Sequence, residues 1–168
     1  AKFASIDTSI TEPMTSQDFY RKLITLNQFI RNGHTNIIPN ENFGSAEKIL
    51  PLEVYWYEDQ LFILRNNSNN LRLVPGTRID SINGEAAAAV FQELADLFPR
   101  DGFNTSFPEA ITYRAFNEFY ISFKAVPDFY DLVVTQASGI PSNIWLPAMD
   151  QEEYNDNRRE RYGDIHYY

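Results

Sequence analysis

Two histidines, His34 and His166, are the side chains of this sequence best suited to acid–base chemistry near neutral pH. His34 stands between Gly33 and Thr35, directly after a stretch with helical periodicity. A catalytic base needs a nucleophile and an orienting group beside it, and the spacing of Ser and Asp residues places neither there. We therefore expect His34 to make local hydrogen bonds at a helix end, and we expect no catalytic residue in this chain. A small hydrolase that uses His34 is the alternative.

Metal and cofactor chemistry is not indicated by the remaining residue types. The sequence has no cysteine, which excludes thiolate catalysis, thiolate metal ligands and disulfides. The two histidines stand in no metal-binding pattern such as HExxH, and the seven glycines form no phosphate-binding loop, dinucleotide fingerprint or nucleophile elbow. The acidic run at 150–156 lacks the spacing and the glycine of a calcium loop. We predict no metal site and no cofactor.

Charge and composition exclude further classes of protein. Fourteen basic and 23 acidic residues give a formal net charge of −9, which repels nucleic acid and anionic lipid surfaces. No apolar stretch approaches the roughly 20 residues that cross a bilayer, so we expect no membrane insertion. Hydrophobic residues make up 43% of the chain, enough for a core that folds without a metal or disulfide.

The first element is a helix expected at 16–32. Thr15 and Asp18 have the spacing of a capping box, and apolar residues follow at intervals of three and four. Gly33 can adopt the left-handed conformation that ends helices, so we place the end of this helix just before it.

A β-rich region is predicted next. Residues 50–58 and 60–64 are apolar and β-branched runs separated by an acidic turn, which indicates a hairpin. A polar turn at 66–70 leads to a short strand at 79–82, and Asn83-Gly84 then forms a tight turn. Two amphipathic helices, about 85–98 and 107–123, precede another β-type run at 129–136. A charged helix around 152–161 follows, and 164–168 could begin another strand.

These elements predict an α+β fold: an N-terminal helical segment followed by a small β-rich domain with two helices. The order of strands, tight turn and helix suggests a groove between an exposed strand edge and the helix at 85–97. Such a groove captures extended peptides by strand addition. The expected peptide-binding residues are Leu52, Val54, Val90, Phe91 and Leu94. An ordinary closed sheet with a covering helix is the alternative.

One segment carries a family resemblance. Residues 75–87 read Pro-Gly-Thr-Arg-Ile-Asp-Ser-Ile-Asn-Gly-Glu-Ala-Ala. They are similar to the Gly-Asp-x-Ile-x-x-Ile-Asn-Gly signature of the PDZ-like domain in C-terminal processing (tail-specific) serine peptidases, with Thr77 at the position of the usual Asp. Residues 15–39, a helix followed by Gly-His-Thr, resemble the segment before that domain. The resemblance covers about residues 15–135.

The resemblance implies a module that grips a polypeptide substrate and presents it to a serine assisted by a lysine in a following peptidase domain. The lysines, Lys2, Lys22, Lys48 and Lys124, lie in or before the PDZ-like region, so none matches the family's general base. We expect three parts: an N-terminal helical segment at 1–45, a PDZ-like domain at 46–137, and a tail at 138–168 leading toward a missing catalytic domain. A secreted, periplasmic or cell-surface bacterial location is also implied.

Two departures from the family pattern bear on peptide binding. Pro51 lacks an amide hydrogen where PDZ-like domains use backbone amides to bind a terminal carboxylate. The helix at 107–123 is an insertion relative to a minimal PDZ domain. The alternative function is therefore a structural or protein-interaction domain whose groove is filled by its own residues 107–123.

Overall fold

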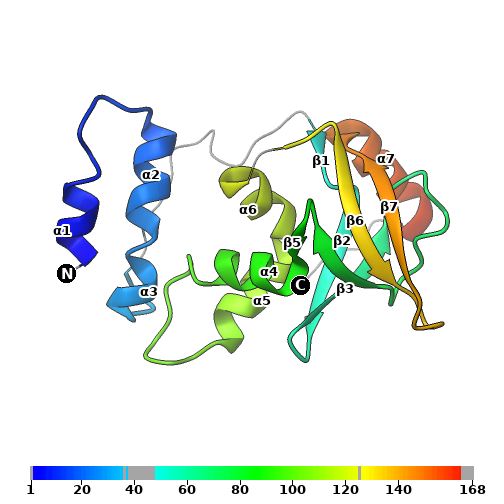
Figure 1. Ribbon diagram of the computed structural model, residues 1–168, viewed down its shortest axis with the longest axis horizontal. Helices are drawn as coiled ribbons and strands as arrows, with labels where there is room; N and C mark the ends of the chain where they lie inside the picture. Colours follow the sequence, from blue (N-terminus) through cyan, green and yellow to red (C-terminus); the bar gives the residue numbers. More distant parts are fainter. Residues whose placement is uncertain (1, 36, 38–47, 125, 164–168) are drawn as a thin grey trace.

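The computed structural model describes residues 2–35, 37, 48–124 and 126–163. It confirms the α+β class, with helices and a mostly antiparallel sheet in the described part of the chain. The loop expected at 39–44, the strand expected at 164–168 and His166 lie outside the described residues. Figure 1 shows three parts along the long axis: helices α1 to α3 at one end, the sheet at the other, and helices α4 to α6 between them.

The main sheet is antiparallel, in the order β2-β3-β4-β6-β7, with β5 paired to β4. Its strands are β2 (Leu52–Tyr57), β3 (Gln60–Asn66), β4 (Arg78–Ile82), β5 (Glu85–Ala86), β6 (Phe129–Thr135) and β7 (Pro141–Pro147). A separate pair joins β1 (Lys48–Ile49) to β8 (Met149–Asp150). Because β7 completes the main sheet, the boundary expected at residue 137 does not coincide with the end of the sheet.

Two tight turns set the register of this sheet, and both were predicted. Glu58 and Asp59 have φ values of 47° and 56° and join β2 to β3 in a two-residue hairpin. Asn83 and Gly84 have φ values of 51° and 82° and join β4 to β5. The Asp131 amide donates to Asn83 Oδ1 at 2.9 Å, and Asn83 Nδ2 donates to the Tyr120 hydroxyl at 3.0 Å. The second turn thus connects the sheet to helix α6 (Phe116–Phe123).

The helix expected at 16–32 is divided in two, and a further short helix precedes it. The N-terminal helices are α1 (Lys2–Asp7), α2 (Ser16–Ile24) and α3 (Asn27–Ile30). The Thr15 cap is confirmed, since Thr15 Oγ1 accepts from the Asp18 amide at 3.1 Å. Arg31, with φ of 51°, ends α3 in the left-handed conformation expected of Gly33. The Gly33 amide instead donates to Asp101 Oδ1 at 2.7 Å, which ties this segment to the loop after α4.

The remaining helices are α4 (Ala87–Ala95), α5 (Ser106–Arg114), α6 (Phe116–Phe123) and α7 (Gln151–Tyr162). The single helix expected at 107–123 is divided at Ala115, whose φ of −119° and ψ of 29° are not helical. None of the helices in the described part of the chain is both long and apolar enough to cross a membrane.

One main core joins the helices to the sheet. The rings of Trp56 on β2 and Phe91 on α4 stack with centroids 4.0 Å apart. Tyr20 and Ile24 of α2 belong to the same buried cluster, and burial raises the pKa of Tyr20 to about 12. Helix α2 therefore shares its core with α4, α6 and the sheet.

Candidate functional site

The side chains expected to line the peptide-binding groove are buried. All five predicted peptide-binding side chains are core residues, each at most 1% exposed: Leu52, Val54, Val90, Phe91 and Leu94. Between β2 and α4 the ring of Trp56 stacks on that of Phe91. Leu52 and Val54 nevertheless border a pocket on another side of β2, whereas Val90, Phe91 and Leu94 do not.

Strand β2 is an edge strand of the main sheet among the described residues. The Ile63 amide donates to the Thr77 carbonyl and the Ile63 carbonyl accepts from the Gly76 amide, both at 2.8 Å, so the backbone of Ile63 faces away from β2. Val54 lies opposite Ile63 in the ladder. In an antiparallel pair, the backbone groups of Val54 therefore point away from β3, toward the free edge.

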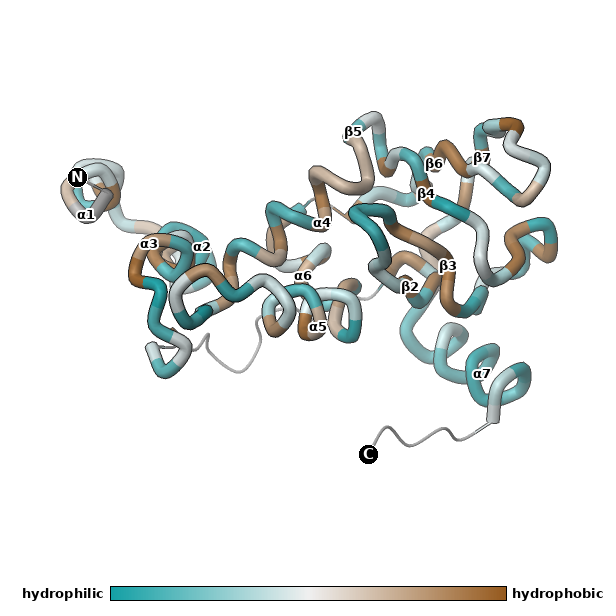
Figure 2. Tube along the Cα trace, turned by 90° about the horizontal axis from the view of Figure 1, so that it is seen from below, coloured by the Kyte–Doolittle hydropathy of each residue, from teal (hydrophilic) through white to brown (hydrophobic). Residues whose placement is uncertain are grey.

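A pocket of about 680 Å³ lies beside this edge. Its lining comes from β2, from Leu64 and Arg65 of β3, from the α5–α6 region and from α7. Figure 2 shows β2 above the interval that separates α5 from α7. A volume of this size is typical of ligand sites.

The helices at 106–123 contact the strand edge directly. Asn117 Nδ2 donates to the carbonyl oxygens of Leu50 and Leu52, at 3.0 and 3.3 Å. The ring of Tyr113 packs edge-on against Tyr55 with centroids 5.3 Å apart. Side chains of these helices thus contact the chain on both sides of Glu53 and Val54: Asn117 before them, and Tyr113 after them.

Glu53 is the electrostatic centre of the pocket. Arg65 Nη1 donates to Glu53 Oε2 at 2.6 Å, and Arg158 Nε donates to Glu53 Oε1 at 2.8 Å. Burial by itself raises the pKa of Glu53, but the hydrogen bonds and charges of the two arginines outweigh burial and lower the pKa below its ordinary value. The carboxylate is thereby held ionised between β3 and α7.

Helix α7 is fixed to the sheet by polar contacts. Arg161 Nη1 donates to the carbonyl oxygens of Asn66 and Ser68, at 2.8 and 2.6 Å, and the Asn66 amide donates to the Tyr162 hydroxyl at 3.0 Å. Asn157 Nδ2 donates to the Asn67 carbonyl at 2.8 Å. The Asn-rich turn predicted as a polar surface element is therefore the docking place of α7, and α7 forms a wall of the pocket.

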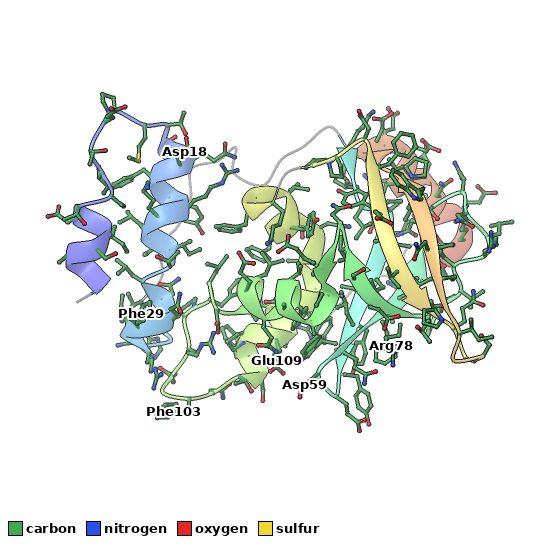
Figure 3. All side chains as sticks on the ribbon, in the orientation of Figure 1. Asp18, Phe29, Asp59, Arg78, Phe103 and Glu109 are labelled. Carbon is green, nitrogen blue, oxygen red and sulfur yellow. The ribbon has the colours of Figure 1, made fainter. Side chains whose placement is uncertain are left out.

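Other places in the described part of the chain are weaker candidates for a functional site. His34 is exposed, and its backbone amide donates to Asn32 Oδ1 at 2.9 Å, which fits the local role expected of it. Within the described ranges, no cluster of His, Asp or Glu could hold a metal ion. Phe29 on α3 and Phe103 in the loop before α5 are exposed, but they lie at the end of the molecule that holds the N-terminal helices (Figure 3).

The sequence analysis missed most residues that line the pocket, including Tyr113, Asn117, Tyr154 and Arg158. The expectation that the helix at 107–123 fills the groove pointed to the region of Tyr113 and Asn117, but not to these residues. The charged helix around 152–161 was predicted, but no local pattern indicated that it would line the pocket, because its place depends on contacts across about 90 residues of sequence, such as that between Asn67 and Asn157.

Comparison with known proteins shows similarity in structure alone. No protein-family model matches the chain, and no curated protein matches it in sequence. Among solved structures, the chain is similar to mature CPAF, a chlamydial serine protease, with a TM-score of 0.63 and 12% identity. It is also similar to mature CPAF complexed with lactacystin, with a TM-score of 0.63 and 13% identity.

These matches cover 88% of this chain, and the chain spans only 28% of the length of the CPAF structures. A serine-to-alanine mutant of CPAF gives the same result, with a TM-score of 0.62 and 13% identity over 89% of this chain. The chain therefore has a fold similar to that of one part of CPAF.

Proposed function

We propose that this chain is a non-catalytic, peptide-binding region of a serine peptidase that resembles the C-terminal processing family. Its PDZ-like character, its division near residues 45 and 137, and an extracytoplasmic location belong to the same proposal. The similarity to part of CPAF supports a protease context. The family resemblance of residues 75–87 supports the substrate-handling role.

The observation that carries this proposal is the pocket beside an edge strand. The backbone groups of Val54 face away from β3, and the pocket of about 680 Å³ borders Val54. An extended polypeptide that enters the pocket would gain net about 0.5–1.5 kcal/mol for each backbone hydrogen bond to the edge. Ordering the peptide offsets much of this gain, so we expect micromolar affinity.

A second function is favoured by a specific contact. Because Asn117 already occupies the carbonyls of Leu50 and Leu52, part of the edge is satisfied by the chain itself. A structural or protein-interaction domain with a self-occupied groove would show this arrangement. In the peptide-binding function, by contrast, these contacts limit the peptide to the part of β2 beyond Leu52.

Fluorescence polarisation with labelled peptides distinguishes the two functions. The probes are short extended peptides with alternating apolar residues, each with a free or an amidated C-terminus. Tyr55→Ala removes a pocket-lining ring, and we expect affinity to fall by about three- to tenfold, the loss of one apolar anchor.

Tyr57→Ala is the matched control. Tyr57 is exposed on the same face of β2, two residues further along, and does not line the pocket. This variant should bind like the original chain. Equal losses for the two variants, or no binding by any peptide, would favour the self-occupied domain.

A further inference from the structure

The pocket is positively charged in a strongly acidic protein. Three arginines, Arg65, Arg114 and Arg158, line it together with Glu53 and Glu118. The formal charges of these three arginines and two glutamates sum to +1, whereas the whole chain carries −9. A ligand that enters the pocket therefore meets an excess of guanidinium groups, which bind carboxylates through charge-assisted hydrogen bonds.

The backbone at residues 51 and 52, where PDZ-like domains bind a terminal carboxylate, offers no free amide. Pro51 has no amide hydrogen, and the Leu52 amide donates to the Leu50 carbonyl at 2.8 Å. Asn117 covers the carbonyls of Leu50 and Leu52. Recognition of an anion at this place thus falls to the arginine side chains.

We propose that these arginines select polypeptides that carry an aspartate or glutamate side chain in the segment bound by the pocket. The inference rests on the proposed peptide binding and adds a substrate class to it. Of the three arginines, Arg114 is exposed, and its guanidinium lies 5.8 Å from the centre of the Tyr113 ring. Arg65 and Arg158 form ion pairs with Glu53. Arg114 can therefore be changed to test peptide selection without removing an ion pair that stabilises the fold.

Fluorescence polarisation against the full chain tests the inference with three short labelled peptides of otherwise identical sequence. The first is amidated and has a central Glu, the second is amidated with Gln in its place, and the third has the Gln and a free C-terminus. We expect the Glu peptide to bind about three- to tenfold more tightly than the amidated Gln peptide at low salt, and the difference to shrink at high salt.

Arg114→Gln should reduce this preference to about twofold or less. Arg72→Gln, at an exposed arginine that does not line the pocket, should keep it. Equal binding of the Glu and amidated Gln peptides overturns the inference and leaves peptide binding intact, as does a preference for the free C-terminus alone. A full preference in Arg114→Gln overturns the assignment to Arg114. Failure of all three peptides to bind overturns the proposed function together with the inference.

Discussion

At the scale of single residues, Glu53 holds the candidate pocket together. It joins β2 to β3 through Arg65 and to α7 through Arg158, and its side chain is only 16% exposed. Exchanging this carboxylate for a neutral group removes the charge from two charge-assisted hydrogen bonds with guanidinium groups. Both the stability of the chain and the position of α7 should therefore depend on Glu53.

Glu53→Gln should lower the free energy of unfolding by about 1–2 kcal/mol, a value between those of surface and buried ion pairs. Urea denaturation followed by circular dichroism measures the change. Glu58→Gln, at an exposed residue of the hairpin turn, is the control and should change stability little. Equal stability of the two variants would show that the ion pairs of Glu53 contribute nothing.

The same residue predicts a pH dependence. Because the pKa of Glu53 is lower in the folded chain than its ordinary value of 4.5, its contribution to stability is present above pH 4.5 and is lost as pH falls through the folded value. Urea midpoints measured from neutral pH down to about pH 3 should fall less steeply for Glu53→Gln than for the original chain. Parallel curves for the two proteins would contradict the assigned pKa shift.

Gly84 is the second residue with a sharp prediction. With φ of 82° and no heavy atom within 4 Å of an added Cβ, a substitution there is opposed by backbone strain and not by a clash. Gly84→Val should cost about 1–3 kcal/mol, whereas Gly84→Asn should cost less, because Asn tolerates the left-handed conformation. Thermal melts compare the two variants. An unchanged midpoint for Gly84→Val would contradict the turn.

At the scale of elements, α4 is a buried support of the sheet and not a wall of the candidate site. Leu94 is fully buried, and an unpaired carboxylate there should destabilise the chain by about 3–5 kcal/mol or unfold it. Ala89→Asp, at an exposed position of the same helix, should change little. Thermal melts followed by circular dichroism measure the stability of both variants. A Leu94→Asp chain that folds normally but no longer binds peptide would contradict this account and support the groove between β2 and α4 that the sequence predicted.

Local chemistry explains what the sequence predicted correctly. The hairpin at Glu58-Asp59, the Asn83-Gly84 turn and the Thr15 cap each depend on a few neighbouring residues, and the structure confirms all three. The helix breaks near Thr25 and at Ala115 interrupt apolar stripes that continue across them, so periodicity alone did not indicate them.

The candidate site was predicted less well, because it depends on which helix lies beside which strand. Alternation along β2 places Leu52, Val54 and Trp56 on one buried face, and that face meets α4 in the core. The opposite face carries Glu53 and Tyr55, and their partners Arg158 and Tyr113 come from distant segments. A pattern within one strand cannot distinguish a core face from a groove when both faces bear large side chains.

At the scale of the whole molecule, α2, α4, α6 and the sheet share one buried core, in a fold similar to that of one part of CPAF. We predict that this chain alone does not hydrolyse peptide bonds, because His34 is exposed and its backbone amide makes a local hydrogen bond to Asn32. A labelled-casein assay on the purified chain measures this. Turnover that survives repurification and disappears in His34→Ala would revive the small-hydrolase alternative.

The central claim is that an extended polypeptide binds along β2, between the α5–α6 region and α7. Backbone amide chemical shifts of the isotope-labelled chain, titrated with a peptide that binds, test it most directly. We predict that the largest changes occur at Val54 and Trp56 of β2 and at residues of the pocket walls, with small changes at the distant Phe29 and Phe103. Changes concentrated around Phe29 and Phe103, with the β2 amides unmoved, would contradict the account.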